Sequence, residues 1–114
     1  METRDAIEAF AALAHAQRLA VFRMLVRIGP NGMAAGDIAA RLDTPPSSLS
    51  FHLGQLERAG LIRSHRQSRH VIYAADIEGT RRLLSYLTED CCEGRPELCG
   101  GLAGAVGGTP PAST

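Results

Sequence analysis

The sequence predicts a mainly α-helical fold with one β-hairpin (α+β), arranged as a winged helix-turn-helix. Residues 35–59 read as two short helices joined by a tight turn, and residues 61–75 read as two alternating strands around a turn that carries arginine. The charge is uneven as well. Residues 47–82 contain six arginines and three acidic residues, a net charge of +3, in a chain of 114 residues whose formal charge is zero. A polyanion would bind at this basic middle segment.

Two helices are expected before the helix-turn-helix. The first runs from Asp5 to Ala14 with Thr3 as its N-cap, and the second runs from about Ala16 to Ile28 and ends at the turn 29–32. The apolar residues at helical spacing are Ile7, Phe10, Ala11 and Ala14 in the first helix and Leu19, Phe22 and Val26 in the second.

The predicted helix-turn-helix begins with a short helix from Ala35 to Leu42, which buries Ile38 and Leu42. Thr44 is predicted as the N-cap and Pro45 as the first residue of the next helix, which Gly60 ends. Leu49, Leu53 and Leu56 recur at helical spacing, so they are expected to face the core. Ser47, Ser48, Phe51 and Gln55 then project outward, and Ser50 and His52 lie on the flanks.

The predicted hairpin consists of strands at residues 61–66 and 70–75 around Gln67-Ser68-Arg69. A last helix then runs from a cap at Asp76 to the cysteines, with Ile77, Leu83, Leu84 and Leu87 along it.

In a winged helix-turn-helix the second helix of the pair enters the major groove with its N-terminal residues at base edges, and the wing contacts backbone or minor groove. The candidate DNA-binding residues are therefore Ser47, Ser48, Ser50, His52, Gln55, Arg66 and Arg69. Taken singly, each serine is explained equally well as part of a solvated helix start, and His52 as a hydrogen-bonded core residue. As a unit, the helix is better explained by DNA binding.

All three cysteines of the chain, Cys91, Cys92 and Cys99, lie within nine residues after the last helix. Thiolate sulfur favours soft or borderline metals. An odd number of cysteines argues against a disulfide framework, and a four-ligand zinc site would need a histidine that this segment lacks. Three thiolates without further ligands suit trivalent arsenic or antimony, and the segment is predicted to bind such an ion.

The predicted organisation is one domain at residues 1–92, a cysteine segment at residues 91–99, and a tail at residues 100–114 whose Gly and Pro content favours disorder. No apolar run approaches the ~20 residues of a membrane span, and the first residues lack the basic opening of a signal peptide. We therefore expect a cytoplasmic protein that does not bind membranes. No nucleophile and base are identifiable together, so an enzyme is the weakest hypothesis and no organic cofactor is expected.

Three segments carry a family resemblance: residues 10–19, residues 49–61 with Ser-Phe-His-Leu at 50–53, and Ile72-Tyr73 at the end of the hairpin. Together they resemble the ArsR/SmtB family of metal-responsive repressors. The resemblance implies a homodimer paired through the first and last helices, bound to a palindromic operator on double-stranded DNA until an inducer releases it. It also implies arsenite as that inducer, since some members carry a three-cysteine site at the end of the last helix.

The sequence also departs from common family patterns. Residues 33–38 lack the cysteines that many members carry there, the last helix has no histidine, and Phe51 stands where many relatives have a polar or basic residue. Four alternatives stay open: a repressor for cadmium, lead, bismuth or mercury, a sensor of a methylated arsenical, a redox-switched regulator whose thiols oxidise, and an interaction module.

Overall fold

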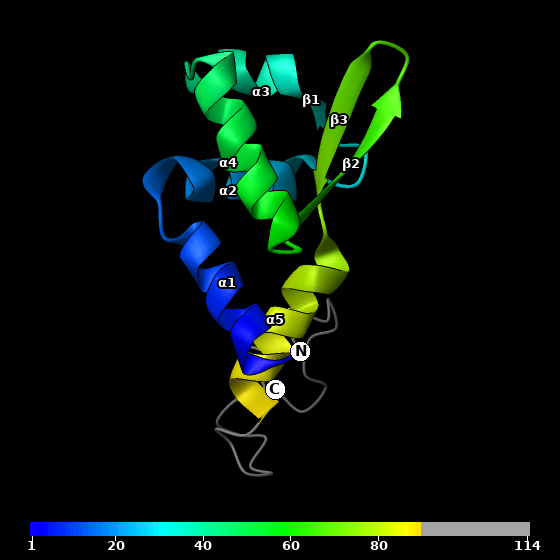
Figure 1. Ribbon diagram of the computed structural model, residues 1–114. Helices are drawn as coiled ribbons and strands as arrows, with labels where there is room; N and C mark the ends of the chain where they lie inside the picture. Colours follow the sequence, from blue (N-terminus) through cyan, green and yellow to red (C-terminus); the bar gives the residue numbers. More distant parts are fainter. Residues whose placement is uncertain (90–114) are drawn as a thin grey trace.

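The computed structural model describes residues 1–89, which form five helices and three strands (Figure 1). In chain order they are α1 (Thr3–Leu13), α2 (Ala16–Ile28), β1 (Met33–Ala34), α3 (Ala35–Leu42), α4 (Pro46–Arg58), β2 (Ile62–Gln67), β3 (His70–Ala75) and α5 (Ile77–Glu89). The predicted winged helix-turn-helix is confirmed. The predicted cysteine segment 91–99 and tail 100–114 lie outside the described residues, so the division into these parts stays a prediction.

The strands form one antiparallel sheet in the order β1-β3-β2. β2 and β3 make the wing, and β1 pairs Met33 with Tyr73 of β3. β1 was not predicted, because two residues are too few to show alternation. The chain enters β1 through Gly32, which has a φ of 72°. It passes so close to β3 that a Cβ at this position would meet the Tyr73 carbonyl oxygen. Only glycine fits both conditions.

The core lies where α4 crosses α2 and α3. Leu49, Leu53 and Leu56 of α4 are at most 2% exposed, as predicted from their spacing, and they belong to the same cluster as Leu25 of α2 and Ile38 of α3. Because these leucines fix one face of α4 inward, the opposite face of the helix is held toward solvent.

The buried faces of α1 and α2 differ from the predicted apolar faces. The buried residues are Ala6, Ala9 and Ala12 in α1 and Val21, Met24 and Leu25 in α2. Ile7 and Phe10 are 62% and 41% exposed, and Leu19 and Val26 are also exposed. Small alanine side chains allow α1 to pack closely within the chain. Its large apolar residues are left on the surface.

The predicted cap of the first helix is also wrong. Thr3 is the first residue of α1, and Glu2 occupies the N-cap position, where its backbone N–H donates to the Asp5 carboxylate at 3.2 Å. The Thr3 hydroxyl lies 2.5 Å from the Tyr86 hydroxyl, which joins α1 to α5. The predicted cap of the last helix is confirmed, because Asp76 Oδ1 accepts the Gly79 N–H at 3.0 Å.

No single helix within residues 1–89 is long and apolar enough to cross a membrane. α1 and α2 together have the length and composition, but they meet at a bend of 100°.

Candidate nucleic-acid interface

The N-terminal half of α4 presents small polar side chains to solvent. Ser47, Ser48, Ser50 and Phe51 are exposed, Phe51 at 58%, whereas His52 and Gln55 are half-buried. The predicted DNA-binding residues of α4 thus share its accessible side. Their contacts with DNA stay predictions. Phe51 interrupts the polar surface, and its ring meets the ring of His52 edge-on at 5.9 Å.

The turn between α3 and α4 is fixed by backbone and side-chain bonds. Asp43 has a left-handed φ of 51°, and the next N–H, of Thr44, donates to the Ala39 carbonyl at 3.0 Å. The Thr44 hydroxyl is buried, donates to the Leu42 carbonyl at 3.1 Å and accepts from the side-chain amide of Gln17 on α2. Thr44 therefore ties the turn to α2, which sets the position of α4 relative to the core.

The predicted N-cap role of Thr44 is wrong as a consequence. Pro45 occupies the N-cap position and Pro46 is the first helical residue of α4. Two consecutive prolines can both be placed here, because neither an N-cap residue nor the first helical residue needs an N–H for the helix. The bonds that Thr44 makes could not be predicted from the sequence. Its partner on α2 is distant in the chain, and its partner on α3 precedes it, whereas an N-cap side chain bonds to residues that follow it.

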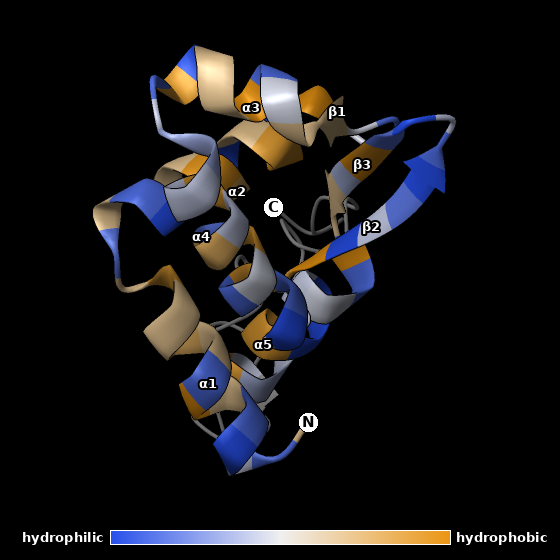
Figure 2. Cartoon of the chain, turned by 45° about the horizontal axis from the view of Figure 1, so that its top comes forward, coloured by the Kyte–Doolittle hydropathy of each residue, from blue (hydrophilic) through white to orange (hydrophobic). Residues whose placement is uncertain are grey.

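The wing carries the other predicted DNA contacts at its tip. β2 pairs Arg66 with Val71 and Gln67 with His70, so Ser68 and Arg69 form the turn. Ser68 has a φ of 58°, which a tight two-residue turn requires. Both Arg66 and Arg69 are exposed. Figure 2 colours the part of β2 toward the tip of the wing as hydrophilic.

The wing is also bonded to α4, the second helix of the helix-turn-helix, which we call the recognition helix. Ser64 of β2 donates its hydroxyl to Glu57 of α4 at 2.6 Å. Tyr73 lies opposite Ser64 in the sheet, and burial followed by the negative charge of Glu57 raises the pKa of its hydroxyl. Glu57 and Ser64 were not predicted as partners, because they lie on different elements and no local pattern pairs them. Their bond joins the wing to α4.

His52 points along the flank of α4 toward the start of α2. Its ring lies 4.6 Å from the ring of His15 between centroids, and its Nδ1 lies 3.4 Å from a terminal nitrogen of Arg18. Burial, then the neighbouring His15 and Arg18, lower the pKa of His52. His52 was predicted as a site residue, but its two partners were not, because they are more than thirty residues away in the chain.

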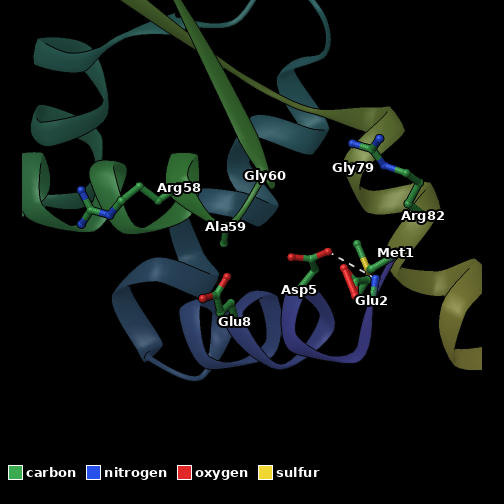
Figure 3. Close-up of a pocket in the computed structure, with 9 residues that line it drawn as sticks. All are labelled: Met1, Glu2, Asp5, Glu8, Arg58, Ala59, Gly60, Gly79 and Arg82. Carbon is green, nitrogen blue, oxygen red and sulfur yellow. Dashed lines mark hydrogen bonds between the residues drawn. The ribbon is translucent and has the colours of Figure 1, made fainter.

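A hollow of about 460 Å³ lies between α1, the end of α4 and α5 (Figure 3). Its charged lining consists of Glu2, Asp5 and Glu8 on α1 with Arg58 and Arg82 on the facing elements. The figure shows Glu8 turned toward Ala59, whereas Arg58 points away from the carboxylates. Within residues 1–89, no three His, Cys, Asp or Glu side chains are placed to hold a metal ion. The predicted metal ligands Cys91, Cys92 and Cys99 lie outside the described residues.

Comparisons with known proteins agree on the fold. Residues 13–65 match the model of a helix-turn-helix domain family. The transcriptional activator HlyU of Vibrio cholerae is 27% identical over 88 residues, which are 77% of this chain and 79% of that protein. The structure of reduced HlyU has a TM-score of 0.61 at 28% identity, and the match covers 75% of this chain and 90% of that one.

Two further structures extend the comparison. The crystal structure of an ArsR family transcriptional regulator is 30% identical with a TM-score of 0.68, over 83% of this chain and 97% of that one. A homodimeric winged helix-turn-helix DNA-binding domain from Mycobacterium bovis has the same fold, with a TM-score of 0.63 at 21% identity over 82% of this chain and 84% of that one. The chain belongs to the ArsR family of DNA-binding, winged helix-turn-helix transcription regulators, which are not enzymes.

Proposed function

We propose that this chain is a cytoplasmic, homodimeric repressor that binds a palindromic operator and is released when trivalent arsenic or antimony binds Cys91, Cys92 and Cys99. The observation that supports this choice of inducer is that every cysteine of the chain lies within nine residues after α5. Family membership supports it, because ArsR regulators sense metals and metalloids. Three thiolates provide the soft donors that such ions prefer.

The dimer is supported by the apolar surface of the first and last helices. Ile7 and Phe10 on α1 and Ile77 and Leu87 on α5 are all more than 40% exposed. α1 and α5 lie side by side at the end of the molecule away from the wing (Figure 1). A second copy would cover such apolar side chains. A two-fold dimer would also present two copies of α4 to major grooves about one helical turn apart, which is why the operator should be palindromic.

The coupling free energy that such a switch needs is modest. A 100-fold loss of DNA affinity corresponds to a coupling free energy of about 2.7 kcal/mol, within the usual allosteric range. Gathering three thiolates around one ion changes the chain directly after α5, and α5 contacts α1 through Tyr86 and Thr3. Binding of the ion would therefore act on the helices that we propose to hold the dimer together.

A redox-switched regulator is the second candidate. HlyU has been solved in a form named as reduced. In this chain, oxidation of the three thiols of the proposed site would need no metal. HlyU is also named as an activator, so release from DNA and repression are separate points to test. Soft ions such as cadmium, lead, bismuth and mercury, and a methylated arsenical that needs only two thiols, are the remaining inducer candidates.

A mobility shift on the DNA upstream of the gene tests the proposal. Arsenite should release the wild-type protein at concentrations that leave a variant with all three cysteines changed to serine fully bound. Changing Cys99 alone should weaken release, whereas Cys99→Ser protein released at the wild-type arsenite concentration would favour a two-thiol site. Release by peroxide with no response to arsenite would favour the redox switch. Ending the chain after Gly100 should change neither binding nor release.

A further inference from the structure

Two histidines and one arginine meet between α2 and the recognition helix α4. The rings of His15 and His52 lie 4.6 Å apart between centroids, at an interplanar angle of 45°. Arg18 reaches the Nδ1 of His52 at 3.4 Å with one terminal nitrogen and donates from Nε to the Ala12 carbonyl at 2.7 Å. Arg18 is thereby held beside both rings.

The hydrogen bonds fix where each imidazole carries its proton. His15 is the N-cap of α2, and its Nδ1 accepts the backbone N–H of Gln17 at 3.1 Å. Arg18 can only donate, so the Nδ1 of His52 is an acceptor too. A neutral imidazole has one N–H, so each ring must carry it on Nε2. Within residues 1–89, neither Nε2 has an acceptor among the hydrogen bonds of the structure, so two N–H donors are free for a ligand.

The surroundings of the cluster are short of negative charge. The charged neighbours that lower the pKa of His52 are His15 and Arg18, after burial. Arg18 also lines a hollow of about 560 Å³ between α1 and α4, together with Glu8, Phe51, Gln55 and Arg58. One carboxylate at this hollow stands against two guanidinium groups, so the flank of α4 has an excess of donors and positive charge.

We propose that His15, Arg18 and His52 bind a phosphate of the DNA backbone next to the groove that α4 enters. The site rests on the DNA binding assigned above and adds α2 to the interface. The exposed serines of α4 face outward, while this cluster lies on the flank of the same helix, where the sugar-phosphate backbone borders the groove. Two imidazole N–H groups and a guanidinium beside them are the donors that a phosphate oxygen accepts.

A phosphate at this position places negative charge beside His52, which favours the protonated form of its ring. When His52 gains its second proton, Nδ1 becomes a donor, and the Arg18 nitrogen that meets it in the free protein turns to the phosphate instead. The pKa of His52 should therefore rise when DNA binds. By linkage, the protein should bind DNA more tightly as pH falls from 8 to 6. A rise of one pKa unit in one ring corresponds to about tenfold tighter binding below both pKa values.

NMR titration of the four histidine side chains of the wild-type protein tests this directly, with and without a random-sequence duplex at low salt. We expect the pKa of His52 to rise by at least half a unit with DNA. An unchanged pKa of His52 in a protein that binds the duplex would overturn the site alone. Failure to bind any duplex would overturn the DNA-binding assignment and the site together. Inorganic phosphate at millimolar concentration should give no comparable rise, and an equal rise would assign the cluster to free anions instead.

Variants give a second measurement. His15→Asn removes the imidazole but keeps a side-chain acceptor for the N-cap of α2. It should lose about three- to tenfold of DNA affinity, because one of the donors to the phosphate is removed. The matched control is the double variant His65→Gln, His70→Gln, which removes the two exposed histidines of the wing. It should retain the tightening of binding at low pH, and loss of that tightening only in the wing variant would overturn the proposal.

Discussion

Gly79→Ala should destabilise the protein by driving the last helix away from the end of the recognition helix. Gly79 lies in the first turn of α5 and is buried against the turn that follows α4. A Cβ on Gly79 would lie 2.0 Å from the carbonyl oxygen of Gly60 and 3.1 Å from its carbonyl carbon. Backbone atoms cannot rotate out of the way as the end of a side chain can. Overpacking of this kind costs about 1–3 kcal/mol.

The displacement would act on a series of hydrogen bonds that joins α5 to α4. Gly79 N–H donates to Asp76 Oδ1 at 3.0 Å, and Asp76 N–H donates to the Leu61 carbonyl at 2.9 Å. Leu61 N–H in turn donates to the Leu56 carbonyl near the end of α4 at 3.0 Å. Moving α5 by the ångström or so that a methyl group needs would stretch at least one of these bonds.

Thermal unfolding followed by circular dichroism measures the effect. For a domain of 60–100 residues, 1 kcal/mol shifts Tm by about 4–8 °C, so Gly79→Ala should lower Tm by roughly 5–20 °C. The matched control is Gly36→Ala, the same change on an exposed face of α3, where a Cβ meets nothing within 4 Å. That variant should be more stable by about 0.5–1 kcal/mol, because alanine favours the helix. A Gly79→Ala protein whose Tm equals or exceeds the wild-type value would refute the argument.

Three other predictions concern the interface. Thr44→Val removes the hydroxyl to which two partners in the buried turn are bonded. Urea unfolding should therefore show a free energy of unfolding that is lower by about 1–3 kcal/mol. An unchanged midpoint would contradict the role of the turn. Arg66→Ala and Arg69→Ala should weaken binding to all DNA sequences and reduce the salt slope by about one per lost phosphate contact, whereas Arg4→Ala on α1 should not. The pKa of His52 is lowered in the fold, so its contribution to stability is fully present above pH 6.5 and is lost as pH falls below 6.5. His52→Gln should reduce that loss between pH 7.5 and 5.5, and an unaltered pH dependence of unfolding would count against it.

Local signals predicted most of the element boundaries. The bounds of α2, α3 and β3 match the predicted ranges because a glycine, a proline or a tight turn borders each of them. The inward face of α4 was also predictable, since three leucines at helical spacing leave one apolar stripe. β1 was not, because its two residues are ordered by pairing with β3 rather than by their own pattern.

Side-chain partners that are distant in the chain could not be predicted. Thr44 was assigned as a helix cap because it precedes proline, yet its hydroxyl bonds to α2 and to the end of α3. The apolar face predicted for α1 included Ile7 and Phe10, yet both are exposed and the buried residues are Ala6, Ala9 and Ala12. Hydrophobic spacing shows that a helix has an apolar face. It cannot show which of two apolar surfaces packs against the rest of the same chain and which stays exposed to solvent.

This division of α1 into two faces bears on how a thiol site after α5 could control DNA binding. α5 is joined to α4 at its start, through Asp76 and Leu61, and to α1 near its end, through Tyr86 and Thr3. Its 13 residues span about 20 Å, so a rotation of about 3° at one end moves the other by about 1 Å. A hydrogen bond contributes about 1 kcal/mol net, so the misalignment of two or three DNA contacts supplies the 2.7 kcal/mol of a 100-fold release. An ion at the proposed thiol site would therefore need no unfolding of the DNA-binding domain, only a small change in the direction of α5 in each subunit of the proposed dimer.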